Sequence, residues 1–284
     1  MCGSELPLTE GGNCGEVFCP DRYLHPSRQT VYGTLIKTSY YSELCKRQQP
    51  VNILLPAGYD EQKSYPVLYI LHGIMEDQNT MVGNEEKGCM ITLGNMMADG
   101  SAKEMIVIFP YEYVSSKQER CTAIDAENAE VYNHFIEDLQ ADLMPFLREK
   151  YRVAEGRENT AIIGFSMGGR QAMAIALKMQ ETFGYVGAIS PAPGLVPGRD
   201  WAMEHPGQFE EEQLKFSMEK PFLFMICCGD RDRVVGRFPK TYHEIFERNG
   251  ERHIWWEIPG SDHGDPAISS GIYHFCRKVF RETV

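Results

Sequence analysis

Short apolar runs alternate with longer amphipathic stretches along most of the chain. The short runs are rich in β-branched and aromatic residues and predict strands that begin near residues 51, 67, 105, 160, 185, 222 and 253. Ahead of them, the segment 30–42 (TVYGTLIKTSYYS) predicts an antiparallel edge strand or a hairpin. Alternation of this kind is typical of an α/β fold, with a mostly parallel central sheet and helices on both faces.

The longer stretches predict helices over 90–98, 128–150, 168–181, 238–249 and 266–281. The clearest of them is 128–150, in which apolar residues recur every four positions on one face. These residues are Val131, Phe135, Leu139, Leu143 and Leu147. Because Pro145 has no backbone N–H to donate, we expect it to kink this helix.

Two segments break the alternation. Residues 191–220 contain too many prolines and glycines for one regular element, so we expect an insertion that lies over the sheet and the active site as a lid. Residues 1–29 are expected to form an irregular N-terminal segment. With no internal repeat and no low-complexity linker, the chain 1–284 is expected to fold as a single domain.

Charge and composition narrow the class of function. With 28 basic and 40 acidic residues, the net charge of -12 repels phosphate backbones and anionic membranes, so neither nucleic acid nor a membrane is an expected partner. No run approaches the roughly 20 apolar residues of a membrane span. The N-terminal residues lack the features of a signal peptide, which predicts a cytoplasmic chain, or a secreted one if the sequence has been trimmed. The oligomeric state is left open.

Cysteine spacing predicts neither a disulfide framework nor a metal site. The nine cysteines form no pair of C-x-x-C units, so reduced thiols are expected. Cys227 and Cys228 fall within a predicted strand, where small side chains fill a buried core.

The run Gly164-Phe165-Ser166-Met167-Gly168 matches G-x-S-x-G directly between a predicted strand and a predicted helix. In this context the serine is forced into a strained turn, and the two glycines leave room where side chains would collide with neighbouring backbone. Ser166 then stands at a helix N-terminus, whose free N–H groups favour developing negative charge. The pattern predicts a nucleophilic serine.

A serine nucleophile needs a base and an orienting carboxylate, and both follow in the expected chain order Ser, Asp, His. Asp230 and Asp232 come just after the strand that ends at Cys228, and His263 comes just after the strand HIWWEI. Loops at the carboxyl edge of a parallel sheet are the usual place for functional residues.

The tetrahedral oxyanion requires two N–H donors. One normally comes from the residue after the nucleophile, here Met167, and the other from a loop after an early strand. His72 and Gly73 end such a strand, so the N–H of Ile74 is the expected second donor.

Three stretches, YPVLYILHGIMEDQN, AIIGFSMGGRQAMAIAL and CCGDRDRVVGRF, resemble the esterase-D-like α/β-hydrolases. The similarity extends from about Thr30 to the C-terminus and is greatest to carbohydrate esterase family 1, which contains feruloyl and acetyl xylan esterases. The resemblance implies the α/β-hydrolase fold and a serine carboxylesterase that needs no metal and no organic cofactor. The family's G-x-x-D places the acid on Asp232, with Ser166 as nucleophile and His263 as general base.

The resemblance favours feruloyl esters of plant xylan, or of its oligosaccharides, as the substrate. Trp201, Tyr111 and Tyr113 lie on segments expected to reach the carboxyl edge, where they would either stack on a phenolic acid or sugar ring or pack the insertion onto the body. Alternatives are acetyl ester hydrolysis, a thioesterase similar to S-formylglutathione hydrolase, acyl transfer to an acceptor other than water, and a non-catalytic sugar-binding protein of the same fold.

Overall fold

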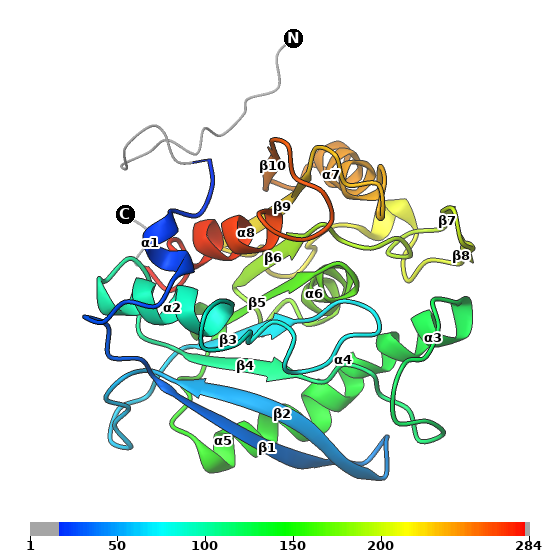
Figure 1. The fold of residues 1–284 in the computed structure, drawn as a ribbon. Coiled ribbons are helices and arrows are strands. Elements are labelled where there is room, and N and C mark those ends of the chain that lie inside the picture. Colours follow the sequence, from blue (N-terminus) through cyan, green and yellow to red (C-terminus); the bar gives the residue numbers. More distant parts are fainter. Residues whose placement is uncertain (1–16, 282–284) are drawn as a thin grey trace.

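The computed structural model describes residues 17–281 and is built around one eight-stranded sheet with the order β1-β2-β4-β3-β5-β6-β9-β10 (Figure 1). Strand β1 is antiparallel to β2, and β2 is antiparallel to β4, whereas all other neighbours are parallel. The strands are β1 Thr34–Ser42, β2 Arg47–Leu55, β3 Val67–Leu71, β4 Ile106–Pro110, β5 Thr160–Phe165, β6 Tyr185–Ile189, β9 Leu223–Gly229 and β10 Ile254–Ile258. The predicted edge strand and the mostly parallel sheet are confirmed.

Helices cover both faces of the sheet. Helices α4 Phe135–Asp138, α5 Met144–Lys150, α6 Met167–Lys178 and α7 Phe238–Arg248 pack on one face, and α1 Asp21–Leu24, α2 Cys89–Ala98 and α8 Ala267–Cys276 pack on the other. Within β5, Ile162 belongs to the first core and Ile163 to the second, because successive side chains of a strand point to opposite faces. The central strands are therefore almost entirely apolar, as expected for strands buried on both faces.

The predicted helix 128–150 is not one continuous α-helix. It consists of α3 Ala126–Val131, a 3₁₀ turn η1 Tyr132–His134, α4, a π-helical turn η2 Leu139–Leu143, and α5. The expected kink at Pro145 is replaced by the π turn, in which the N–H of Met144 donates to the carbonyl of Leu139. Pro145 falls in the first turn of α5, where a missing N–H breaks no helical bond. The predicted apolar face still points inward at Phe135, Leu139, Leu143 and Leu147.

The segment 191–220 contains only the two-residue strands β7 Gly198–Arg199 and β8 Glu204–His205 and a 3₁₀ turn η4 Glu211–Gln213. Figure 1 shows β7 and β8, together with α3, at the side toward which the parallel strands point. This is the carboxyl edge of the sheet.

The expectation of an irregular segment over 1–29 falls partly outside the described residues. Within 17–29 the chain is irregular except for one helical turn, α1. This single turn forms because Tyr23 is buried against Tyr273 of α8, with the ring centroids 5.3 Å apart. All seven cysteines among residues 17–281 are buried, and Cys227 and Cys228 carry free thiols as predicted. In the same range no helix combines the length and the apolar character needed to cross a bilayer.

Candidate active site

Ser166 occupies the sharp turn between β5 and α6. Its backbone has φ 54° and ψ −115°, a strained conformation for a residue with a side chain. The turn is fixed by its own backbone, since the N–H of Ser166 donates to the carbonyl of Ile189 at 2.9 Å and its carbonyl accepts from the N–H of Ala192 at 2.9 Å. The hydroxyl is thereby held at the start of α6, at the carboxyl edge of the sheet.

The two glycines of the pentapeptide are required by close backbone contacts. A Cβ on Gly164 would lie 2.2 Å from the carbonyl of Gly168, and a Cβ on Gly168 would lie 2.5 Å from the carbonyl of Leu71. The N–H of Gly168 also donates to the carbonyl of His72 at 2.8 Å. The elbow is therefore in direct backbone contact with the loop that follows β3.

His263 lies between Ser166 and Asp232. Its Nδ1 is 2.7 Å from Oδ2 of Asp232, and its Nε2 is 3.1 Å from Oγ of Ser166. A carboxylate only accepts hydrogen bonds, so Nδ1 carries the proton and donates it, which leaves the lone pair of Nε2 to accept from the serine hydroxyl. The ring also packs on Phe165, with centroids 4.6 Å apart. These three side chains form one hydrogen-bonded series.

Asp232 is held as an ionised acceptor. Burial alone would raise its pKa, but the hydrogen bond and charge of His263 and the N–H of Val235 outweigh burial, so the pKa of Asp232 is lowered. Its other oxygen, Oδ1, accepts from the N–H groups of Val234 at 3.0 Å and Val235 at 3.2 Å. Asp230, the neighbouring candidate, instead accepts from the N–H of Gly260 and is exposed.

Two N–H groups remain beside the serine. The loop after β3 is held by the N–H of Gly73, which donates to Glu76 Oε2 at 2.7 Å, and by that of Met75, which donates to Tyr132 Oη at 3.1 Å. The N–H groups of Ile74 and Met167 donate to no protein acceptor within the described range. Met167 directly follows Ser166, and Ile74 packs against the cluster that contains Met167. Their N–H groups therefore remain the predicted donors to an oxyanion formed at Ser166.

The predicted aromatic contacts are only partly at the mouth of the site. Tyr113 is 1% exposed and donates to Asn128 at 2.6 Å, and Tyr111 is 7% exposed and donates to the carbonyl of Glu119 at 3.1 Å. Both rings are buried in a cluster with Tyr132 and Met167, so they offer no open face for stacking. This corrects their assignment as substrate contacts.

Trp201 is 73% exposed, between β7 and β8. Its Nε1 donates to the carbonyl of Val234 at 3.3 Å, two residues after Asp232. The hairpin that carries it is closed by Asp200, whose Oδ2 is 2.9 Å from Nε2 of His205. Trp201 is thus the one predicted aromatic side chain that presents an open surface next to the site.

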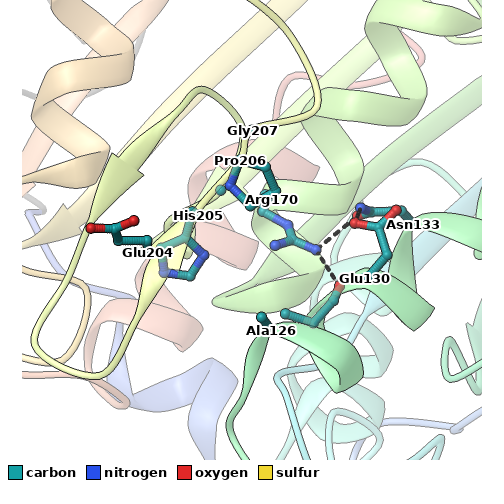
Figure 2. Close-up of a pocket in the computed structure, with 10 residues that line it drawn as sticks. Ala126, Glu130, Asn133, Arg170, Glu204, His205, Pro206 and Gly207 are labelled. Atoms are coloured by element: carbon teal, nitrogen blue, oxygen red, sulfur yellow. Dashed lines mark hydrogen bonds between the residues drawn. The ribbon is translucent and has the colours of Figure 1, made fainter.

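Arg170 connects the helix of the nucleophile to its surroundings. Its guanidinium is buried and donates to the carbonyl of Ala129 at 3.0 Å, to Asn133 Oδ1 at 2.9 Å and to the carbonyl of Pro193 at 3.3 Å. Figure 2 shows it between Asn133 and the residues of β8, beside a cavity of about 20 Å³, which has room for about one water molecule. Arg170 therefore ties α6 to α3 and to the segment 191–220. Sequence reasoning did not identify this role, because it depends on carbonyl groups distant along the chain.

No metal site accompanies these residues. Within residues 17–281 no three His, Cys, Asp or Glu side chains are grouped to hold an ion.

Comparison with known proteins adds a family and close structural relatives. A family model described as "Putative esterase" matches residues 42–262. The fold is similar to that of the CE1 ferulic acid esterase from the anaerobic fungus Anaeromyces mucronatus, solved in complex with ferulic acid. The two are 39% identical with a TM-score of 0.89, and the match covers 95% of this chain and 98% of that one.

Two further relatives are more distant. A mutant feruloyl esterase module from Clostridium thermocellum, complexed with sinapinate, is 20% identical with a TM-score of 0.71 over 93% of each chain, which shows a common fold. An endo-1,4-beta-xylanase/feruloyl esterase from Xylanibacter ruminicola is 26% identical over 227 residues, or 78% of this chain. This chain spans only 28% of the length of that relative.

Proposed function

Because the chain belongs to the esterase family and, within it, to carbohydrate esterase family 1, we propose that it hydrolyses feruloyl esters of plant xylan or its oligosaccharides. The observation that carries the proposal is the series Ser166, His263 and Asp232, with contacts of 3.1 and 2.7 Å. The 39% identity to a ferulic acid esterase supports the choice of acyl group.

The reaction proceeds in two steps. Oγ of Ser166 attacks the ester carbonyl while Nε2 of His263 takes the hydroxyl proton, and the same proton then passes to the oxygen of the leaving sugar alcohol. Water attacks the acyl-enzyme by the same route in reverse and releases the acid. Asp232 holds the tautomer of His263 and stabilises its charged form. The N–H groups of Ile74 and Met167 bind the oxyanion in both steps.

Trp201 is the proposed contact for the aromatic ring of the acyl group or for a sugar ring. An exposed indole beside the acid loop offers an apolar face and costs little side-chain entropy when it is covered. The segment 191–220 then acts as the insertion that borders the substrate.

A second candidate is hydrolysis of acetyl esters by the same residues. It is favoured by the burial of Tyr111 and Tyr113, which removes two of the three aromatic contacts expected for a phenolic acyl group. The mechanism is unchanged, and only the size of the acyl group differs.

The two are separated by kcat/KM for methyl ferulate, 4-nitrophenyl acetate and acetylated xylo-oligosaccharide, with Ser166→Ala as the blank. A strong preference for methyl ferulate supports the first candidate. Activity limited to acetyl esters refutes it and supports the second.

A further inference from the structure

A buried carboxyl group lies directly behind the loop that supplies the Ile74 donor. Glu112, just past the end of β4, is 0% exposed. Its Oε1 accepts from the N–H of His72 at 2.7 Å, and its own N–H donates to Nε2 of His72 at 3.2 Å. His72 and Glu112, which are 40 positions apart, are thereby joined by two hydrogen bonds. In each of them the backbone N–H of one residue donates to the side chain of the other.

The ring of His72 is neutral and has one defined tautomer. Nδ1 lies 2.7 Å from the carbonyl of Gly73, which only accepts, so Nδ1 carries the proton. Nε2 is then the acceptor that the N–H of Glu112 requires. Burial lowers the pKa of His72 to about 4, so the 3.9 Å approach of Nδ1 to Oε1 of Glu112 is not an ion pair at neutral pH.

No Lys or Arg side chain among residues 17–281 forms an ion pair with Glu112. The titratable and charged groups around it are His72 after β3, Glu76 in the same loop, Tyr132 of η1 and Arg170 of α6. Within residues 17–281 none of them forms an ion pair with Glu112 at neutral pH, and Oε2 of Glu112 has no hydrogen-bond partner. Burial, reinforced by the charge of Glu76, raises the pKa of Glu112 well above its usual range despite the N–H of His72 and the charge of Arg170.

We propose that Glu112 is a positioning residue for the oxyanion hole, and that it works as a neutral carboxylic acid which fixes His72 and thereby the N–H of Ile74. The inference rests on the proposed esterase function. The same backbone of His72 accepts from the N–H of Gly168, so Glu112 sets the position of the loop relative to the helix that carries Met167.

The neutral form is needed for an electrostatic reason. Negative charge develops on the substrate oxygen in the transition state, and an ionised carboxylate behind the loop would repel it in a poorly screened interior. A neutral acid keeps the acceptor that His72 requires without that repulsion. Glutamine has the same shape and the same acceptor, so it should replace Glu112, whereas alanine removes the acceptor and leaves a buried N–H unpaired.

The test compares Glu112→Ala and Glu112→Gln by kcat and KM for 4-nitrophenyl acetate, a substrate that does not require a feruloyl preference. Removal of one oxyanion donor costs about 10²- to 10³-fold in kcat, so a displaced donor in Glu112→Ala should cost about tenfold or more with KM nearly unchanged. Glu112→Gln should stay within about threefold of the wild type, because a preserved acceptor keeps the donor in place. Full activity of Glu112→Ala, a loss confined to KM, or equal losses in both variants would overturn the proposal.

The protonation state is read separately from the infrared difference spectrum of the wild type minus Glu112→Gln at neutral pH. The proposal requires the carbonyl band of a protonated carboxylic acid in this difference, and a carboxylate band instead would refute it. Asp138→Asn is the matched control, since Asp138 is a buried carboxyl that accepts from Tyr40 and Ser42, away from the site. It should leave kcat unchanged. Absence of any turnover above the Ser166→Ala blank in the wild type would instead refute the esterase function.

Discussion

Gly168→Ala, which adds a single methyl group, should lower the activity much more than the stability. A Cβ added there would lie 2.5 Å from both C and O of Leu71 and 2.6 Å from the carbonyl oxygen of His72. All three are backbone atoms, so no side chain can rotate away. To lengthen the distance from this Cβ to Leu71 to the 3.4 Å of an ordinary contact, the turn at Ser166 and the loop after β3 must move apart by about 0.9 Å.

The expected magnitudes follow from that displacement. Overpacking of this kind costs about 1–3 kcal/mol of stability, and the gain in helix propensity from glycine to alanine returns up to about 1 kcal/mol. Activity should suffer more, because the N–H groups of Ile74 and Met167 stand on the two segments that separate. A misplacement of about 1 Å in a catalytic constellation costs about 10²-fold in rate.

The assay is kcat/KM for an aryl ester together with urea unfolding of the same preparation. Gly169→Ala is the matched control, since a Cβ there meets its nearest atoms at 3.0 to 3.2 Å and needs a shift of only a few tenths of an ångström. Gly168→Ala should remain folded and lose about 10²-fold in kcat/KM, while Gly169→Ala loses much less. Equal activities of the two variants would refute the argument from backbone contact.

Three further predictions concern separate parts of the chain. Asp232→Asn should lower kcat by about 10⁴-fold, because the carboxylate that sets the tautomer of His263 is lost. Asp230→Asn should keep most of the activity. A larger loss of kcat in Asp230→Asn than in Asp232→Asn would contradict the assignment. Trp201→Ala should raise KM for methyl ferulate more than for 4-nitrophenyl acetate, whereas equal changes would reduce the indole to a packing role. His243 Nδ1 lies 2.8 Å from His253 Nε2, and burial lowers the pKa of both rings. The neutral rings therefore contribute their full stabilisation above the unfolded pKa of about 6.5, and this contribution is lost as the pH falls through the folded pKa values. The free energy of unfolding, measured with urea, should therefore fall on acidification. If this free energy depends on pH in His253→Gln as it does in the wild type, the prediction is contradicted.

Much of the fold could be predicted because its signals are local. The strand before Ser166 is a nearly continuous apolar run, and the glycines around Ser166 are required by close backbone contacts. The breaks in the helix 126–150 could not be predicted from periodicity, because 3₁₀, α and π turns all keep Phe135, Leu139 and Leu143 close to one face.

The candidate site was predictable where chain order and motif decide, as for Ser166 and His263. It was not predictable just after β4, where the directions in which the side chains point determine which of them can reach a substrate. Tyr111 and Tyr113 flank Glu112 in the sequence, but the packing of η1 and α6 decides that both rings are buried. The role of Glu112 depends on a partner 40 residues earlier, which no local pattern reveals.

In the proposed mechanism Ser166 carries the acyl group, and peptide mapping of a quenched reaction detects that group on the chain. The chain is mixed with an excess of 4-nitrophenyl ferulate, quenched in acid during the burst and digested with trypsin. We expect the feruloyl mass on the peptide ENTAIIGFSMGGR, residues 158–170, whose single serine is Ser166, and no adduct in Ser166→Ala. A feruloyl adduct on any other peptide, or full turnover by Ser166→Ala, would contradict it.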